Sequence, residues 1–532
     1  MSPNGSAYDF VVIGSGAGGG TFAGIAAAAG AKVLVIERGP IQAIPGNDHL
    51  TNQRLSVYGH NAGPDANQVR IVDGRRELPW APSYQANAAM LGGGTQVYGA
   101  QAWRFHPNDF KMASLYGVPE GSSLADWPLD YKELEPWYSL AERMIGVCGA
   151  ASSMVHLPWT TSDYPMPPLP AGRPGNVLRR GVDALKWRSC TVPLAINSVP
   201  YAGRKACLQC EECVGFACGV NAKNGSHNTW LHRGIQSGNL DIMTDTAVTR
   251  IHHSMGTVTG LTYVNEQLGE QTISCRNLIC AAGTIETARL LIASGFDNPH
   301  IGRNLQGHVY TGVTGLFKDE IRDGIGPGPT LAVTEFLHDN DGYVGGGMLA
   351  DEFVMTPITY WKRHRAPGVP RFGQDAKSWM LNTYSRVLDI KGPIQDIPSS
   401  ECRVEISTSE RDVLGMPLVQ LSGHTHPESI RTSRLMFEKA SELMRACGAE
   451  DVWGVPHRGA IRSAGQHQAG TCRMSLSETS GVVDANQKIF GFSNVHICDA
   501  SVHVTNGTFN PVLTIYALAH RLGFHLTGWM PN

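Results

Sequence analysis

Residues 8–37, YDFVVIGSGAGGGTFAGIAAAAGAKVLVIE, constrain the fold more than any other stretch of the sequence. The first apolar run predicts a buried strand, and the Ala-rich run after it predicts a helix. A second apolar run, KVLVIE, predicts the next strand and ends on Glu37. Between the first strand and the helix, Gly14, Gly16 and Gly19 form the pattern G-x-G-x-x-G. This combination predicts the strand–turn–helix–strand unit that binds a dinucleotide.

Each part of this unit has a physical role. Gly14 permits the tight turn, Gly16 lets a pyrophosphate approach the backbone, and Gly19 lets the helix pack closely on the strand. The N-terminus of the helix offers free N–H groups and the positive end of its dipole to phosphates. Glu37 follows Gly14 at the distance expected for the acid that accepts hydrogen bonds from the hydroxyls of an adenosine ribose. Arg38 is assigned to the same cofactor site.

Composition and charge exclude several classes of protein. With 42% hydrophobic and 17% charged residues in 532, the chain is neither disordered nor fibrous, and its length predicts two or three structural units. A net charge of −3 gives no reason to expect a nucleic acid or an anionic membrane as partner. No basic segment precedes the first strand, and the early run AGIAAAAGA is too short to span a bilayer. We therefore expect a cytoplasmic protein.

The strand and helix patterns predict an α/β fold with two domains. Glycine-rich strand–helix units occur in residues 1–310 and again in 460–532, which predicts a Rossmann-type nucleotide-binding domain that is split in sequence. Within it, residues at about 151–230 are Pro-rich and then cysteine-rich, and they predict a lid-like excursion. Residues 311–459 alternate strands with long turns, so we expect an α+β substrate-binding domain with an antiparallel sheet.

The C-terminal part contains two further informative segments. HQAGTC includes His467, and NPVLTIYALAHRL predicts a helix with Asn510 as its N-cap and Pro511 at its first position. From the residues alone, Asn510 is a capping residue and His467 is a turn histidine beside glycines.

Six segments resemble, in the same order, those of the glucose–methanol–choline (GMC) oxidoreductases. They are the N-terminal fingerprint, GGGTQVYGAQAWRF, CAAGTIETARLL, IGRNLQGH, HQAGTC and CDASVHVTNGTFNPVLTIYALA. The resemblance spans nearly the whole chain and is closest in style to the sugar-oxidising, pyranose-oxidase-like branch. It implies that the dinucleotide is FAD. Some relatives attach FAD covalently through a histidine where this chain has Gln96, which implies that FAD is held non-covalently here.

The resemblance also implies roles for individual residues. His467 would take the proton of a substrate hydroxyl, for which an imidazole pKa of about 6.5 is suitable. Asn510 would hydrogen-bond the same oxygen, and a hydride would pass to the flavin N5. The expected cofactor-binding residues are Gly14, Gly16, Gly19, Glu37, Arg38, Gly93, Gly94, Thr95, Val248, Ala282, Asp499, Ala500, Asn510, Pro511 and Val512.

The implied reaction is the FAD-dependent oxidation of a CH–OH group of a sugar, glycoside or amino sugar, for example an aminoglycoside-type primary alcohol to an aldehyde. Its partners would be this small-molecule substrate and oxygen or another electron acceptor. Three alternatives stay open. The chain could be an oxidase of secondary alcohols in C-glycosides or pyranoses that gives a keto sugar, a dehydrogenase subunit with an iron–sulfur cluster, or a non-redox lyase of the same family.

Four cysteines cluster in the sequence. Cys207, Cys210, Cys213 and Cys218 are spaced C-x2-C-x2-C-x4-C, which is similar to ferredoxin spacing. The last interval is one residue longer than in the bacterial pattern, and Gly219 stands where that pattern has proline. The spacing therefore favours structural thiols without a metal, with an iron–sulfur cluster or zinc as alternatives.

Overall fold

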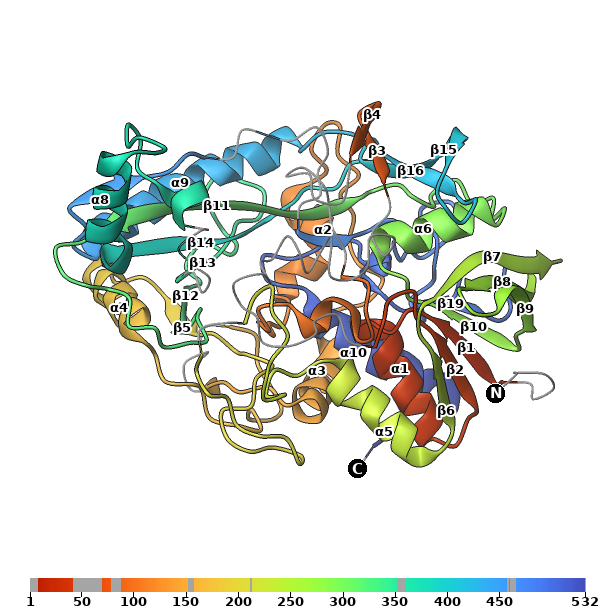
Figure 1. Cartoon of the computed structure of the whole chain (residues 1–532). Coiled ribbons are helices and arrows are strands. Elements are labelled where there is room, and N and C mark those ends of the chain that lie inside the picture. Colours follow the sequence, from red (N-terminus) through yellow and green to blue (C-terminus); the bar gives the residue numbers. More distant parts are fainter. Residues whose placement is uncertain are drawn as a thin grey trace.

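A computed structural model of the chain describes residues 8–41, 69–77, 88–151, 157–210, 213–351, 357, 360–456, 459 and 466–531. Figure 1 shows two lobes, with a parallel sheet in one and a long antiparallel sheet in the other.

The first lobe is organised around a five-stranded parallel sheet, in the order β19-β10-β1-β2-β6. Its strands are β1 (Phe10–Ile13), β2 (Val33–Ile36), β6 (Leu240–Met243), β10 (Asn277–Cys280) and β19 (Val495–Ile497). Three helices pack together beside it: α1 (Ala17–Ala28), α5 (Trp230–Ser237) and α10 (Val512–Thr527). Because β19 and α10 come from the end of the chain, this lobe is built from two separate parts of the sequence.

Two smaller sheets flank this lobe. The first is an antiparallel sheet of β7 (Thr246–Ser254), β8 (Thr257–Asn265) and β9 (Gly269–Ser274). The second joins β15 (Arg403–Arg411) and β16 (Pro417–Ser422) to β3 (Arg70–Val72) and β4 (Arg75–Glu77). Helix α6 (Thr284–Ala293) follows β10 and lies against both sheets.

The second lobe contains the antiparallel sheet β17-β11-β14-β13-β12-β5, to which β18 adds beside β11. Its strands are β11 (Gln306–Leu316), β14 (Val387–Gln395), β13 (Leu349–Asp351), β12 (Leu331–Val333), β17 (Asp451–Trp453), β5 (Ser189–Thr191) and β18 (Gln466–Ala469). Helices α4 (Arg173–Leu185) and α9 (Pro427–Ala446) cover one face, where Val309, Val313, Ile390 and Ile394 are buried. Because side chains alternate along a strand, His308 and Tyr310 of β11 project from the other face.

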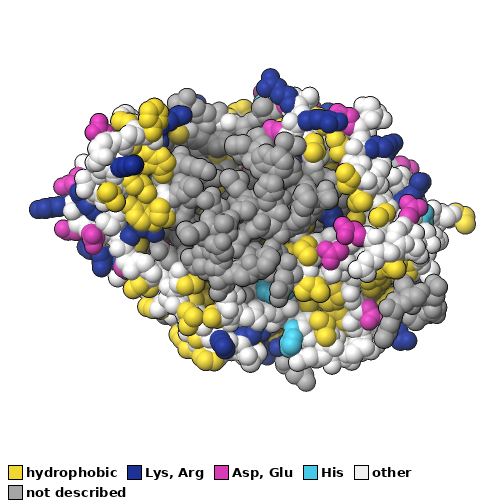
Figure 2. Space-filling view, in the orientation of Figure 1, with side chains coloured by type: hydrophobic (Ala, Val, Ile, Leu, Met, Phe, Trp, Pro, Cys, Tyr) yellow, Lys and Arg dark blue, Asp and Glu magenta, His cyan; other side chains and the backbone are white. Residues whose placement is uncertain are grey.

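The other α-helices of the described residues are α2 (Met112–Tyr116), α3 (Tyr131–Ile145) and α8 (Gln374–Thr383), and α3 packs against α10. The predicted α/β class, with a Rossmann-like parallel sheet and separate antiparallel strands, is confirmed. None of the helices in the described ranges has the length and hydrophobicity needed to cross a bilayer. On the face shown in Figure 2, basic and acidic side chains of the described residues are interspersed.

Candidate active site

The glycine turn between β1 and α1 has the geometry that its sequence predicts. Gly14 has a φ of +92°, and a Cβ atom built on it would lie 2.3 Å from the Ala281 carbonyl oxygen. A Cβ on Gly19 would lie 2.2 Å from the Gly14 carbonyl oxygen, so helix and turn pack without room for a side chain. At Gly16, by contrast, no atom of the described residues lies within 4 Å of the Cβ position. The turn is therefore tightly packed on the protein side and open beside Gly16.

Glu37 lies beside this turn and also fixes it. Its carboxylate accepts hydrogen bonds from the Ser15 N–H (3.0 Å), the Ser15 Oγ (2.5 Å) and the Gly39 N–H (2.9 Å). Burial raises the pKa of Glu37 despite these donors. Arg38 turns toward Glu286 at the start of α6, with 3.8 Å between the nearest charged atoms. Glu37 thus has a role in shaping the turn that the sequence pattern alone did not reveal.

A second glycine loop lies against the first. The Gly92 N–H donates to Ser15 Oγ (2.9 Å), and a Cβ on Gly93 would lie 3.1 Å from the Gly16 Cα. Gly93, Gly94 and Thr95 belong to the 3-10 helix η2 (Gly93–Gln96), and Thr95 Oγ1 donates to the Gly92 carbonyl (2.7 Å). The structure therefore brings both predicted glycine motifs to one place.

The segment before α5 joins these two loops, a contact that no local sequence pattern predicts. Ser226 Oγ donates to the Ser15 carbonyl oxygen (2.8 Å). A Cβ on Gly92 would lie 3.0 Å from His227 Nδ1, and this nitrogen is buried without a hydrogen-bond partner among the described residues. Burial lowers the pKa of His227 to about 4, so its ring is neutral. A buried polar atom of a neutral ring thus lies beside the second glycine loop.

The remaining predicted cofactor residues are distributed around the same turn. Asp499 accepts hydrogen bonds from the Gly283 N–H (3.0 Å), Thr287 Oγ1 (2.7 Å) and the Ser501 N–H (2.9 Å), and so connects the end of β19 to α6. Burial raises the pKa of Asp499. A Cβ on Gly14 would lie 3.1 Å from the Cα of Ala282, and Ala500 follows Asp499 directly. Val248 belongs to β7, which begins where the Thr246 N–H donates to the Glu37 carbonyl (3.1 Å).

His467 and Asn510 meet although 43 residues separate them. Asn510 Nδ2 lies 3.3 Å from His467 Nε2. His467 has a φ of +62°, a strained conformation for a residue with a Cβ, and Asn506 Nδ2 donates to its carbonyl oxygen (2.6 Å). Asn510 Oδ1 is buried and lacks a hydrogen-bond partner within the described ranges. One polar atom of the pair is thus available for a bound molecule.

The predicted capping role of Asn510 is wrong. Helix α10 begins at Val512 with Pro511 as its N-cap, and no side chain of the described residues caps it. Asn510 lies one residue outside the cap, so its amide is directed to His467 instead of to the first turn. Pro511 and Val512 stand at the N-terminus of α10, beside the histidine.

Two further residues of the site went unrecognised in the sequence. His308 Nδ1 lies 2.8 Å from His467 Nδ1, and Tyr310 Oη lies 3.5 Å from the same atom. His308 Nε2 contacts the carbonyl oxygens of Asn506 (3.1 Å) and Gly507 (3.0 Å). IGRNLQGH contains His308, but only the pairing of β11 with β18 brings it to His467. No pattern within either segment reports that pairing.

The cysteine cluster lies at the surface beside the second glycine loop. All four thiols are free, with Cys210 exposed and the other three half-buried. Across the described residues, no group of three or more His, Cys, Asp or Glu side chains has an arrangement that could hold a metal ion. The buried Lys223 ammonium donates to the carbonyl oxygens of Tyr98 (3.0 Å), Cys213 (2.5 Å) and Phe216 (2.7 Å), and burial lowers its pKa to about 8. This lysine ties the cysteine loop to the segment that follows Thr95.

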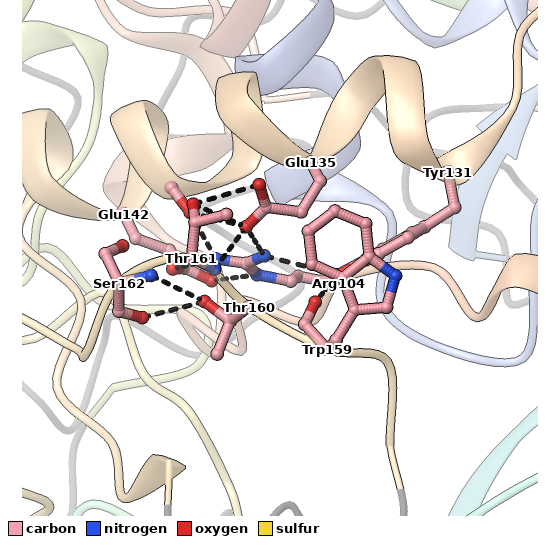
Figure 3. Close-up of polar contacts among 9 residues, drawn as sticks. Arg104, Tyr131, Glu135, Glu142, Trp159, Thr160, Thr161 and Ser162 are labelled. Carbon is pink, nitrogen blue, oxygen red and sulfur yellow. Dashed lines mark hydrogen bonds and ion pairs between the residues drawn. The ribbon is translucent and has the colours of Figure 1, made fainter.

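A buried ion cluster anchors that segment at its other end (Figure 3). Arg104 donates from Nε and Nη2 to both oxygens of Glu142 (2.8 and 2.7 Å) and from Nη1 to Glu135 (2.9 Å). Both glutamates come from α3, and Thr161 N–H also donates to Glu135 (2.8 Å). The second glycine loop is therefore followed by a fixed attachment to α3.

Comparison with known proteins places the chain in a family. Two models described as GMC oxidoreductase match residues 170–310 and 398–519. The chain is 28% identical to paromamine 6'-oxidase of Streptomyces fradiae over 97% of its own length and 90% of the relative. It is 26% identical to 2-methyl-1,2-propanediol dehydrogenase of Mycolicibacterium austroafricanum, over 99% and 96% of the two chains.

Solved structures show the same fold. The crystal structure of pyridoxine 4-oxidase from Mesorbium loti superposes with a TM-score of 0.65 at 18% identity, covering 98% of this chain and all of that one. The family models, the fold and the ordered motifs show that the chain belongs to the GMC oxidoreductases, a family of FAD-binding enzymes that oxidise alcohols.

Proposed function

We propose that this enzyme oxidises a CH–OH group of a sugar, glycoside or amino sugar, with His467 as the base that accepts the hydroxyl proton. The observation that carries the proposal is the approach of His467 Nε2 and Asn510 Nδ2 to 3.3 Å. An acceptor and a donor at this separation can both contact one hydroxyl oxygen. Tyr310 of β11 lies beside this pair, and the division into a FAD-binding domain and a substrate-binding domain at residues 311–459 stays part of the proposal.

The residues around the glycine loops fit FAD. Space beside Gly16 and Gly94 is free of atoms of the described residues, and the buried Nδ1 of His227 lacks a partner among them. Glu37 would hold the adenosine ribose, and the two glycine loops with the N-terminus of α1 would hold the pyrophosphate. Bound FAD supplies the acceptor for the two electrons that leave the substrate C–H bond.

The protein residues then handle the proton and the oxygen. His467 Nε2 takes the hydroxyl proton, while Asn510 Nδ2 donates a hydrogen bond to the oxygen that becomes the carbonyl. The N-terminus of α10, at Pro511 and Val512, places the positive end of a helix dipole near this charge. Both contacts are prepared before substrate binds, so little reorganisation is needed during the reaction.

Substrate identity is the finer part of the proposal. Similarity to paromamine 6'-oxidase supports an aminoglycoside-type primary alcohol that becomes an aldehyde. The test is anaerobic bleaching of the flavin by pairs of amino sugars and neutral glycosides, each matched with its analogue deoxygenated at the primary alcohol. We expect the parent compounds to bleach the flavin and the deoxy analogues to leave it oxidised. Bleaching by both members of a pair would favour the keto-sugar alternative, and cleavage of substrate without bleaching would favour the lyase.

Covalent attachment of FAD is not expected. Gln96 has a carboxamide, which cannot form the bond that a histidine makes with the flavin, and its Nε2 donates to the Leu91 carbonyl within its own loop (2.5 Å). Acid precipitation of the purified holoenzyme should release all of the flavin absorbance into the supernatant, measured against the total before precipitation. Yellow colour that stays with the pellet would contradict non-covalent binding.

The cysteine loop is proposed to contain structural thiols. Iron and acid-labile sulfide, measured per FAD in anaerobically purified protein, should both fall well below one equivalent. Stoichiometric iron and sulfide, with absorbance beyond the flavin bands, would instead support the dehydrogenase-subunit alternative. The electron acceptor is a separate question, because the chain is similar to both an oxidase and a dehydrogenase. Rapid reoxidation of the substrate-reduced enzyme by air would identify oxygen as the acceptor.

A further inference from the structure

The base in the proposed reaction needs its lone pair on the correct ring nitrogen. A neutral histidine carries hydrogen on only one nitrogen, and the partner of the other nitrogen decides which. His467 faces Asn510 and the proposed substrate oxygen with Nε2, so Nδ1 must carry the hydrogen. This inference rests on the proposed function and concerns the residue that sets this tautomer.

The protonation of His308 follows from its own contacts. Its Nε2 lies 3.1 Å from the Asn506 carbonyl oxygen and 3.0 Å from that of Gly507. Carbonyl oxygens only accept hydrogen bonds, so Nε2 must carry a hydrogen. His308 is 3% exposed, and burial lowers its pKa to about 4, so the ring is neutral and has only this N–H. Its Nδ1 is therefore an acceptor.

This acceptor lies 2.8 Å from His467 Nδ1. Two nitrogen atoms this close must share a hydrogen bond, so the nitrogen that faces the lone pair of His308 Nδ1 must carry a hydrogen. The hydrogen of the neutral His467 ring is therefore on Nδ1, and its lone pair is on Nε2. Tyr310 Oη is farther from the same nitrogen, at 3.5 Å, and is a weaker competitor. Asn506 contributes to both histidines, since its carbonyl accepts from His308 and its Nδ2 donates to the His467 carbonyl.

We propose that His308 is a positioning residue that holds His467 in its Nδ1–H tautomer and so keeps the lone pair on Nε2, the nitrogen that takes the substrate proton. When His467 becomes protonated, the same hydrogen bond becomes charge-assisted and stabilises the imidazolium. A carboxylate in this place would also attract a proton to His467 before substrate binds. The neutral imidazole of His308 orients the base without adding that charge.

The direct test is 15N NMR of the FAD-saturated protein labelled in its histidine rings, with signals assigned by means of a His467→Ala variant. We expect a protonated Nδ1 and an unprotonated Nε2 at His467 in the unmodified enzyme. In His308→Leu, which lacks the acceptor, His467 should show a mixture of tautomers. Protonated Nε2 in the unmodified enzyme, or an unchanged 15N pattern in His308→Leu, would overturn the proposal.

Kinetics provide a second readout. His308→Leu should slow anaerobic flavin reduction by substrate about 10- to 100-fold, by analogy with the loss when the hydrogen-bond partner of a metal-ligating histidine is removed. His308→Gln, whose Oε1 can accept from His467 Nδ1, should recover most of this rate. FAD affinity, measured by fluorescence titration, should be equal in both variants, and equal rates for Leu and Gln would contradict the positioning role.

The two proposals fail in different ways. A failure of the proposed function would be seen as an unchanged reduction rate in His467→Ala, whatever the tautomer of the native histidine. The tautomer measurement needs no substrate, and it does not depend on whether a variant at position 308 folds. The spectrum of the unmodified holoenzyme alone can overturn the inference.

Discussion

Replacing His467 by alanine should slow the reduction of bound FAD by substrate by about 10²–10⁴-fold, the range that a positioned general base contributes. The alanine variant keeps Asn510 and the N-terminus of α10 but lacks an acceptor for the hydroxyl proton. FAD should stay bound with unchanged affinity, because the predicted cofactor contacts are made by other residues. Stopped-flow mixing under anaerobic conditions, followed at the flavin absorbance maximum, measures this rate directly.

His232 offers a matched control. It is an exposed histidine on α5, away from β18, so His232→Ala should reduce its flavin at the rate of the unmodified enzyme. Reduction of His467→Ala at that same rate would remove His467 from the role of base. Loss of FAD from His467→Ala, on the other hand, would show that the residue acts mainly in holding the cofactor.

The nucleotide-binding turn could be predicted because its determinants are local. Gly14, Gly16, Gly19 and Glu37 lie within one strand–helix–strand unit. Close backbone contacts leave no room for a side chain at Gly14 and Gly19, whereas Gly16 borders open space within the described residues. The same holds for the general α/β class. Because the whole strand–helix–strand unit lies within residues 8–37, few alternative geometries are available to its turn. The turn in the structure therefore has the shape that the sequence predicts.

The contact between His467 and Asn510, the proposed catalytic pair, does not follow from local sequence rules. His467 and Asn510 were identified through a family resemblance, whereas local rules assigned Asn510 to a helix cap. The helix begins one residue later than those rules require, and this small shift turns the amide from the backbone to His467. His308 was not predicted, because the contact depends on the pairing of β11 with β18, which joins residues 159 apart.

The burial of several polar groups also does not follow from the sequence. Lys223 and His227 lie in a polar segment whose composition suggests a surface loop. Lys223 is nevertheless only 2% exposed, and its ammonium group is enclosed by three carbonyl oxygens. Arg104 is likewise buried against two glutamates of α3. Such burial depends on which segments cover the residue, and those segments are far away in the sequence.

Replacing Arg104 by alanine should destabilise the folded enzyme by about 3–5 kcal/mol, the cost of leaving buried charges without their partner. The side chains of Glu135 and Glu142 are 0% and 2% exposed, so water cannot take over the role of the guanidinium. Burial raises the pKa of Glu142 even with Arg104 present. The pKa of Glu135 is lowered, in spite of its burial, by hydrogen bonds from Thr161, Arg104 and Ser139. Without the arginine, two carboxylates would face each other in the core.

Arg188 provides the control for this prediction. It makes a similar two-point contact with Glu335, at 2.9 and 3.3 Å, but the Arg188 side chain is 56% exposed. Arg188→Ala should therefore cost less than about 1 kcal/mol. Urea unfolding of the FAD-saturated proteins, with FAD held in equal excess, compares the two variants without a contribution from cofactor loss.

A double variant separates charge burial from lost packing. Arg104→Met with Glu142→Leu removes one complete ion pair and leaves Glu135 with its donors from Thr161 and Ser139. Replacing both partners by apolar residues of similar volume is far less costly than removing one. We therefore expect the double variant to be more stable than Arg104→Ala, although it differs from the native sequence at one more position. If Arg104→Ala lost no more stability than Arg188→Ala, the cluster would not be the attachment that fixes the second glycine loop to α3.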